Sequence, residues 1–163
     1  MNQPSSSSRF SRESHGLLDD VAKRIIEALQ QDGRRSYASI AGSVGLSEAA
    51  VRQRVARLTE AGIMQIVAVT NPLTLGFHRQ ALIGVRADGD LRKVADRIGQ
   101  ISEVDYVVIT AGSFDIICEV VCEDDEHLLT VLNDGVRLVD GVRDTETLVY
   151  LHLTKQTYSW GTR

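Results

Sequence analysis

The sequence predicts an α+β protein with two small domains: three helices in the first third of the chain and a βαββαβ unit in the rest. Up to Gly62, apolar residues recur at three- and four-residue spacing, which is the period of an amphipathic helix. Beyond Gly62, runs rich in Ile and Val alternate with helical stretches. At 163 residues the chain is long enough for two small cores that support each other.

Three helices are predicted at residues 17–62, after a polar tail at residues 1–16. The tail holds four consecutive serines and almost no apolar side chains, so we expect it to be disordered. The first helix is expected at about Asp20 to Asp32, with acidic residues near its positive end and Gly33 as a left-handed stop.

The second and third helices follow closely, and cap residues mark their boundaries. Ser36 is the expected N-cap of a short helix that ends at Gly45. Ser47 caps the third helix, which runs to about Ala61 and is closed by Gly62. Three short helices with such brief connections are typical of a compact bundle.

After Gly62 the periodicity changes from α to β. Residues 63–78 are expected to form a connecting strand, Ile63 to Thr70, and then a linker after a turn signal at Asn71-Pro72. Residues 79–163 are expected to form the second domain. Its predicted elements are a strand at about Gln80 to Ala87, a helix at about Asp90 to Gln100, a strand at about Val104 to Thr110, a strand at about Asp115 to Cys122, a helix at about Asp125 to Gly135 and a strand at about Arg143 to Leu153.

This element order is that of the ferredoxin-like fold, a four-stranded antiparallel sheet with both helices on one face. Residues 111–114 are expected to join the middle strands as a tight hairpin. The other face carries apolar residues of the last strand, either Leu148 and Tyr150 or Val149 and Leu151, depending on register. Because a large apolar face is unfavourable in water, we expect a second copy of the chain to cover it.

The segment from Tyr37 to Ala56 fits a helix-turn-helix in steric terms. Ala41 is small where the two helices must approach closely, Gly45 tolerates the turn, and Val51 anchors the second helix. In DNA-binding proteins the second helix of such a motif enters the major groove. A tri-helical bundle without a ligand is the alternative interpretation of the same pattern.

The outer face of the third helix suits DNA, because it is small and neutral at its start and basic further along. We expect Gln53 to bond an adenine edge and the arginines to bond guanine or phosphate. An arginine before the second helix is a candidate phosphate contact. The candidate DNA-binding residues are Ser47, Ala50, Arg52, Gln53, Arg54, Arg57 and Arg34.

The distribution of charge agrees with a DNA-binding first domain. The formal net charge is −4, but residues 1–62 carry nine Lys or Arg and seven Asp or Glu, a net charge of +2, and residues 63–163 carry −6. Local rather than total charge controls contact with phosphate. Because no apolar run approaches roughly 18 residues and the N-terminus is polar, we expect a cytoplasmic, nucleoid-associated protein.

The sequence offers no pattern typical of a metal site, a cofactor or an enzyme. Cys118 and Cys122 fall on one face of a predicted strand, where buried reduced thiols are expected. There is no Walker-type or GxGxxG loop. The four histidines have no metal-ligand spacing and are dispersed at His15, His78, His127 and His152.

Over about Leu17 to Trp160 the chain resembles the Lrp/AsnC family of transcription regulators, named for the leucine-responsive regulatory protein and the asparagine regulator. The resemblance implies a winged-type helix-turn-helix, a ferredoxin-like ligand domain, dimers formed through the sheets, and rings of dimers, often octamers. The residues that carry it are Leu18-Asp19, Asp32-Gly33-Arg34, Ile40-Ala41, Val44-Gly45-Leu46-Ser47, Val51, Arg54-Val55, Leu58, Ala61-Gly62-Ile63, Pro72, Leu75-Gly76-Phe77, Gly112 and Asp115.

The resemblance also implies a small-molecule effector, commonly an amino acid, that binds between dimers. The matching residues are Gly112, Asp115, Thr145 and Thr147. A glycine exposes backbone groups to a zwitterion, a carboxylate pairs with its ammonium, and hydroxyls complete the site. The glycine and the aspartate are also ordinary turn residues, so hairpin chemistry alone is the alternative. Phe114 stands where the family frequently has tyrosine, so the resemblance does not identify the effector.

The most consistent interpretation is a sequence-specific DNA-binding transcription regulator modulated by a small molecule, and two others stay open. One is an enzyme, because a group of decarboxylases acting on sirohaem is similar to the family in both halves. The other is a ligand-binding assembly module whose helical head does not read DNA, since a fold alone does not establish function.

Overall fold

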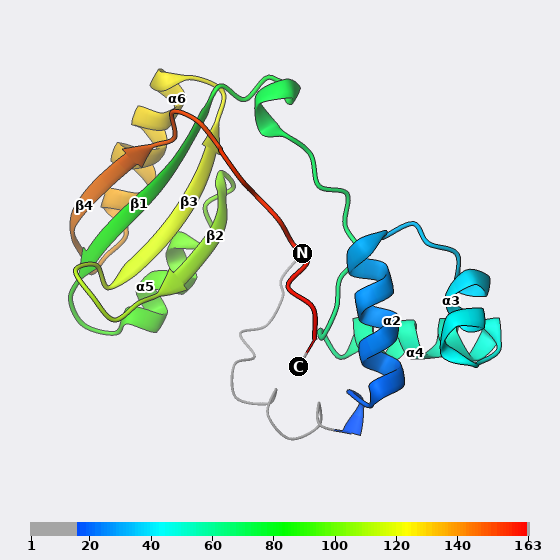
Figure 1. Ribbon diagram of the computed structural model, residues 1–163. Helices are drawn as coiled ribbons and strands as arrows, with labels where there is room; N and C mark the ends of the chain where they lie inside the picture. The colour runs from blue at the N-terminus through cyan, green and yellow to red at the C-terminus, as the bar shows by residue number, and fades with distance from the viewer. Residues whose placement is uncertain (1–15, 163) are drawn as a thin grey trace. The chain divides into compact units, whose positions relative to one another are not determined.

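The computed structural model describes residues 16–162, and the chain folds as two compact units (Figure 1). The first unit contains the chain up to Ala68 together with the segment from Lys155, and the second runs from Val69 to Thr154. Apart from Gly16, the predicted disordered tail lies outside the described residues. In the described part of the chain, no helix is both long enough and apolar enough to cross a membrane.

Three helices form the first unit: α2 (Asp20–Gln31), α3 (Tyr37–Val44) and α4 (Glu48–Glu60). Each begins after a side chain whose oxygen accepts a hydrogen bond from a backbone N–H group of the first turn, which satisfies a donor that the helix leaves unpaired. The predicted caps of the second and third helices are confirmed. The capping residues are Asp19, Ser36 and Ser47.

The helix ends agree with the prediction at two glycines and differ at a third. Gly45 and Gly62 are left-handed, with φ of 76° and 67°. The left-handed stop predicted at Gly33 is wrong, because Asp32 leaves α2 with extended backbone at φ −148°. The carboxylate of Asp32 accepts a hydrogen bond of 2.9 Å from the backbone N–H of Arg34, so a polar side chain closes this turn instead.

Apolar side chains from all three helices form the core of the first unit. Ile25 of α2, Ile40 of α3 and Val51 of α4 are fully buried in it. Ala41 is buried beside them, where its small size allows α3 and α4 to approach each other. The core therefore holds α4 in a fixed orientation to α3.

The connecting strand predicted at Ile63–Thr70 is wrong for the single chain. These residues form no strand, and a short 3-10 helix, η2 (Pro72–Leu75), follows them. Ile66, Val67 and Val69 are exposed. A strand needs a neighbour for its backbone hydrogen bonds, and none of the described strands pairs with this segment. Within the described residues, the helical head therefore has no β wing of its own.

The second unit is a four-stranded antiparallel sheet with its helices on one face, as predicted (Figure 1). The strand order is β2-β3-β1-β4, which is the ferredoxin-like arrangement. The elements are β1 (Arg79–Ala87), α5 (Leu91–Ile98), β2 (Val104–Ile109), β3 (Ile116–Cys122), α6 (Asp125–Thr130) and β4 (Val142–Val149).

The second helix and the last strand of this unit are shorter than predicted. After α6 the chain continues as a π-helical turn, η3 (Val131–Gly135), and a 3-10 turn, η4 (Val136–Leu138). β4 ends before the predicted end at Leu153. The backbone N–H of Tyr150 bonds to the carbonyl of Gln80 at 2.8 Å, near the beginning of β1, so β1 offers almost no further residue for pairing.

The face of the sheet beneath the helices forms the core of the second unit. Ala81, Ile83 and Val85 of β1 are fully buried there. Cys118 and Cys122 of β3 lie on the same face as free, buried thiols, as predicted. Burial raises the pKa of each thiol to about 11, so both stay protonated near neutral pH.

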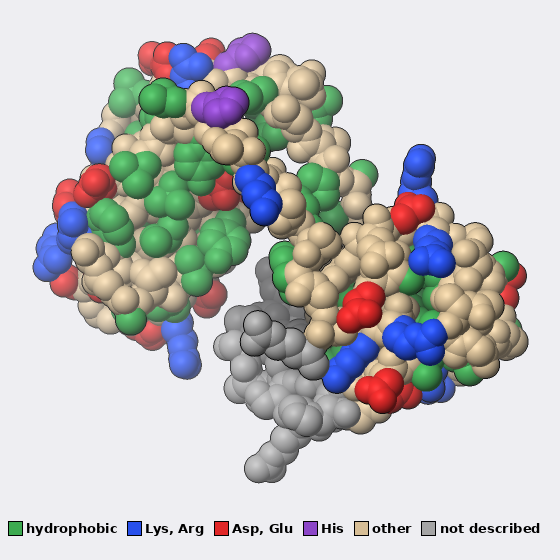
Figure 2. Space-filling model, viewed as in Figure 1, with side chains coloured by type: hydrophobic (Ala, Val, Ile, Leu, Met, Phe, Trp, Pro, Cys, Tyr) green, Lys and Arg blue, Asp and Glu red, His purple; other side chains and the backbone are tan. Residues whose placement is uncertain are grey.

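The opposite face of the sheet carries no helix, and we refer to it as the open face. The register places Leu148 opposite Leu82 on this face, whereas Val149 points toward the helices. Of the two alternatives predicted for the last strand, Leu148 and Tyr150 are therefore the residues on the open face. Tyr106 and Leu148 are 54% and 50% exposed. Figure 2 shows apolar side chains gathered over this sheet, which is the uncovered surface that the sequence predicts.

Candidate nucleic-acid interface and ligand site

The turn between α3 and α4 sets the direction in which α4 leaves the core. The backbone N–H groups of Gly45 and Leu46 both bond to the carbonyl of Ala41, at 3.0 and 3.1 Å. Ser47 then caps α4 by accepting a hydrogen bond of 3.2 Å from the backbone of Ala50. The predicted helix-turn-helix is therefore formed, with a tight turn and a capped second helix.

Most of the candidate DNA-binding residues lie along α4, on the sides that face away from its buried stripe. Val51, Val55 and Leu58 form that stripe and are buried. The candidates on α4 and its cap that are exposed are Ser47, Arg52, Gln53 and Arg57, and those that are half-buried are Ala50 and Arg54.

Arg52 lies on the side of α4 that faces the beginning of α3. Its guanidinium is 5.3 Å from the centre of the Tyr37 ring and 2.7 Å from a carboxylate oxygen of Glu48. An ion pair this exposed contributes little free energy, so a phosphate or a base edge can replace the glutamate at small cost. Arg52 is thus held on the helix surface and is available to DNA.

Arg54 has a partner that the sequence did not indicate. Its guanidinium forms hydrogen bonds of 2.9 and 2.8 Å to both carboxylate oxygens of Asp19, the residue that caps α2. The backbone N–H of Ala22 and the guanidinium of Arg54 hold the pKa of Asp19 below its ordinary value of 3.8. Arg54 therefore joins α4 to the start of α2, and its role as a base contact stays a prediction.

The other side of α4 forms one wall of a shallow cavity of about 280 Å³ in the first unit. Ala50, Gln53 and Arg57 line it together with the pair formed by Asp19 and Arg54. Four of the candidate residues are therefore brought together on one side of α4, whereas Arg52 lies on the other side.

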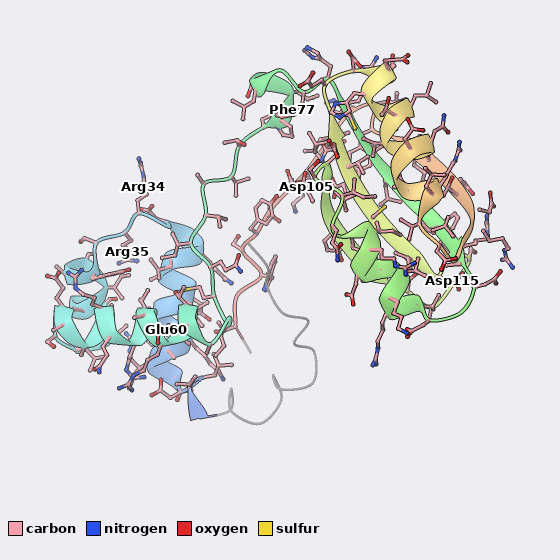
Figure 3. All side chains as sticks on the ribbon, turned by 180° about the vertical axis from the view of Figure 1, so that it is seen from behind. Arg34, Arg35, Glu60, Phe77, Asp105 and Asp115 are labelled. Atoms are coloured by element: carbon pink, nitrogen blue, oxygen red, sulfur yellow. The ribbon has the colours of Figure 1, made fainter. Side chains whose placement is uncertain are left out.

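The remaining DNA-binding candidate, Arg34, lies in the loop between α2 and α3. Figure 3 shows Arg34 and Arg35 projecting from this loop. Arg35 is half-buried and its Nε lies 3.4 Å from the hydroxyl of Ser39, whereas Arg34 is exposed. The position of Arg34 suits a contact with phosphate more than contact with a base edge, because it is not on α4.

The candidate ligand hairpin joins β2 to β3 and is bonded tightly to β1. The backbone N–H of Asp115 bonds to the carbonyl of Val85 at 3.0 Å, and a carboxylate oxygen of Asp115 accepts the N–H of Ala87 at 2.9 Å. Asp115 lies at the end of the sheet (Figure 3). One carboxylate oxygen of Asp115 is thus bonded within the fold, which agrees with the structural role in the hairpin that the sequence left as an alternative. The second carboxylate oxygen accepts no hydrogen bond within the described residues, so it can still contact a ligand.

Thr145 and Thr147, the other candidate ligand residues, lie on β4 and are half-buried. Thr145 is opposite Val85 and accepts a hydrogen bond of 3.0 Å from Nε of Arg137. The strand order places β1 between β4 and the hairpin strand β3. Within one copy of the chain, the threonines and the hairpin are therefore on separate strands rather than side by side.

Sequence reasoning missed two arginines near these candidates, Arg137 and Arg86. Arg137 lies in η4 and bonds to Asn133 of η3 at 2.7 Å as well as to Thr145. Arg137 and Asn133 lie in the π-helical and 3-10 turns that follow α6, and the sequence has no periodic pattern that predicts such turns. Arg86 follows ordinary strand alternation, but its partners are distant along the chain.

The described residues contain no group of three or more His, Cys, Asp or Glu side chains placed to hold a metal ion. His15 lies outside the described residues. His127 is on α6, where its Nε2 is 3.3 Å from a carboxylate oxygen of Glu103. This pair gives the histidine an ordinary structural partner on the surface of the second unit.

Two family models match the chain, one in each unit. A model described as an AsnC-type helix-turn-helix domain matches residues 18–59. A second, described as a C-terminal dimeric alpha+beta barrel domain, matches residues 77–163.

Known regulatory proteins match over most of the chain. An HTH-type transcriptional regulator of Pyrococcus furiosus is 34% identical and is covered over 98% of its length by 88% of this chain. The structure of AsnC of Escherichia coli matches with a TM-score of 0.73 and 26% identity, over 86% of this chain and 97% of that one. A transcriptional regulator of Neisseria meningitidis in complex with L-Met matches with a TM-score of 0.74 and 26% identity, over 87% and 95%.

The pair formed by Asp19 and Arg54 predicts how the first unit responds to acid. Because the folded-state pKa of Asp19 is lowered, its contribution to stability is present above the ordinary value of 3.8 and is lost as the pH falls through the folded value. We expect Asp19→Asn to lower the midpoint of thermal unfolding at neutral pH and to reduce the further loss that occurs as the pH falls below the ordinary value of 3.8. Circular dichroism of melting at a series of pH values measures both effects.

Asp20→Asn is the matched control, since it removes the same charge one residue further along, in the first turn of α2. This variant should keep the acid response of the unmodified protein. An Asp19→Asn protein with an unchanged response to acid would show that the pair does not stabilise the helical head.

Proposed function

The chain belongs to the Lrp/AsnC family of transcription regulators, and we propose that it reads specific duplex DNA with α4 and changes its activity on binding an amino acid. The observation that carries the DNA-reading part is the formed helix-turn-helix, in which a left-handed Gly45 presents a capped, exposed and basic α4. The protein is a regulator and not an enzyme, in agreement with its family models and relatives.

The residue chemistry of α4 supports entry into the major groove. Small residues near its start, such as Ala50, let the helix approach base edges closely. The amide of Gln53 matches the donor and acceptor of an adenine edge, and Arg52 and Arg57 match guanine or phosphate. Arg34 would fix the position of the head by bonding a phosphate outside the groove.

Arg54 takes a different part in this proposal. Because both its hydrogen bonds to Asp19 are internal, it holds α4 against α2 and contributes to DNA binding through the orientation of the helix. The side chain of Arg54 is 35% exposed, so it is partly buried against the head.

We propose a dimer formed through the open faces, and rings of such dimers, up to an octamer. The family model of the second unit is described as a dimeric barrel, which agrees with two four-stranded sheets facing each other. A dimer carries two heads, so its operator would contain two half-sites one or more helical turns apart. A regulator of this kind acts in the cytoplasm, on the DNA of the nucleoid.

The proposed effector is an amino acid bound between dimers. The relative from Neisseria meningitidis was solved with L-Met. In this chain the backbone of Gly112 would meet the zwitterion, Asp115 its ammonium group, and Thr145 and Thr147 its remaining polar atoms. Because the hairpin and the threonines lie on separate strands, we propose that two copies of the chain complete one site.

Substitutions in the head should separate base contacts from phosphate contacts. We expect Gln53→Ala and Arg52→Ala each to weaken binding to the protein's own upstream DNA by about 1–3 kcal/mol and to leave binding to scrambled DNA almost unchanged. Arg34→Ala should weaken binding to both DNAs and lower the salt slope by about one. Fluorescence anisotropy at several salt concentrations measures these effects.

Arg92→Ala, which removes an equal charge from α5 of the second unit, is the control and should leave both affinities unchanged. Equal affinity of the unmodified protein for upstream and scrambled DNA would contradict the proposal. That result would favour an assembly module that does not read sequence.

The ligand site is tested by screening the twenty amino acids one at a time by thermal shift. An amino acid at about one hundred times its Kd should stabilise the protein by about 2.7 kcal/mol. Asp115→Asn keeps an oxygen for the backbone of Ala87 but removes the charge, so this stabilisation should be lost. Asp105→Asn, on an exposed residue of β2, is the control. Equal stabilisation of the native protein and Asp115→Asn would exclude Asp115 as a contact.

A further inference from the structure

We propose that Arg86 of β1 is the positioning residue of the effector hairpin. Its guanidinium holds the hairpin of residues 111–114, at the end of the sheet, in the geometry that an amino-acid ligand needs. The inference rests on the proposed amino-acid site and adds to it a residue that does not touch the ligand.

Arg86 makes four contacts that join separate parts of the sheet, one of them between its Nη2 and a carboxylate oxygen of Glu146, at 4.0 Å. Its Nε donates a hydrogen bond of 3.1 Å to the carbonyl of Ser113, and its Nη1 donates one of 2.7 Å to a carboxylate oxygen of Asp144 on β4. The guanidinium also lies 4.7 Å from the centre of the Phe114 ring, within the range of a cation–π interaction. One side chain thus links β1, β4 and the hairpin.

The ring of Phe114 rests on the sheet because Gly84 has no side chain. A Cβ atom at position 84 would lie 2.7 Å from carbon atoms of the ring, which is closer than carbon atoms approach each other. Gly84 lies between Ile83 and Val85, whose side chains are buried beneath the helices, so this missing Cβ is on the open face. Glycine therefore provides the space, and Arg86 covers the ring.

The remaining hydrogen bonds show which part of the hairpin is left for a ligand. Thr110 donates its hydroxyl to the carbonyl of Phe114 at 2.6 Å and its N–H to the carbonyl of Asp115 at 2.9 Å. With Ser113 bonded to Arg86, three successive carbonyls are occupied. The N–H and carbonyl of Gly112 form no hydrogen bond within the described residues, so these groups stay available at the tip of a fixed hairpin.

The chemistry of Arg86 favours a role in geometry over a role in total stability. The carboxylate of Asp144 that pairs with Arg86 is 58% exposed, so solvent screens this ion pair and limits its contribution to the free energy of unfolding. A guanidinium is a planar fork that bonds in two directions and stacks on a ring at the same time, which the ammonium group of lysine does not do. Loss of Arg86 should therefore loosen the hairpin without unfolding the sheet.

The test uses Arg86→Met, Arg86→Lys and Gly84→Ala, with Arg97→Met as the control. Arg97 lies on α5 and forms a longer and more exposed ion pair with Asp140, at 3.4 Å. Two readouts are measured on the full chain: hydrogen–deuterium exchange of a peptide that contains residues 110–115, and the affinity for whichever of the twenty amino acids stabilises the native protein.

We expect all three test variants to exchange hydrogen faster in that peptide. They should also bind the amino acid at least about tenfold more weakly, because affinity falls tenfold when the hairpin has its binding geometry for only a tenth of the time. The melting of Arg86→Met and Arg86→Lys without ligand should stay close to that of Arg97→Met, whereas Gly84→Ala, which displaces the ring, should melt at a lower temperature. Arg86→Lys should show the same faster exchange and weaker binding as Arg86→Met, because the charge of an ammonium group does not replace the planar guanidinium.

Native exchange or native affinity in Arg86→Met would overturn the proposal. A fall in melting temperature that accounts for the whole loss of affinity would also overturn it, because Arg86 would then be a structural residue only. If no amino acid stabilises the native protein, the proposed effector is wrong, but hydrogen exchange still decides whether Arg86 positions the hairpin.

Discussion

The uncovered side of the four-stranded sheet is the constraint on which the rest of this molecule depends. Both helices lie on one face, so Leu82, Tyr106 and Leu148 remain on the other, and apolar side chains in such a patch are stabilised by leaving water. A second copy of the same sheet supplies a face of the same size and chemistry. In the proposed dimer, pairing two sheets would also pair two helical heads, and each head would contact one half-site of the DNA.

The two parts of the chain differ in charge. Residues 1–62, which include the helix-turn-helix, carry a net charge of +2 and residues 63–163 carry −6, so the negative charge of the protein comes from the second part. Within the head, the arginines of α4 differ in their partners. Arg54 is held by Asp19, whereas Arg52 has only an exposed glutamate partner that a phosphate can replace.

The features that could be predicted from the sequence are those whose causes are local. Ser36 and Ser47 cap helices that begin one residue later, Gly45 makes its own turn, and strand alternation places Cys118 and Cys122 on one face. The order of the elements then leads to the ferredoxin-like sheet, because few arrangements accommodate βαββαβ.

Features that depend on distant partners could not be predicted in this way. Asp19 and Arg54 are 35 residues apart, and Arg86 and Asp144 are 58 apart, so no spacing rule connects them. The segment Ile63–Thr70 has the composition of a strand but no neighbour in its own chain. Gly33 has the sequence pattern of a left-handed helix stop, but the turn after α2 is closed by the carboxylate of Asp32, which accepts a hydrogen bond from the backbone N–H of Arg34.

The most direct test of this account is to charge the open face and to measure assembly and DNA binding together. Leu148→Asp places a carboxylate on the surface that a second copy would cover, at a residue of the edge strand β4 that is half-exposed in the single chain. This variant should sediment as a folded single copy. Its affinity for the full upstream site should be at least about a hundredfold lower, because the two heads are no longer linked. A single-copy variant that binds the full site as tightly as the native protein would contradict this account.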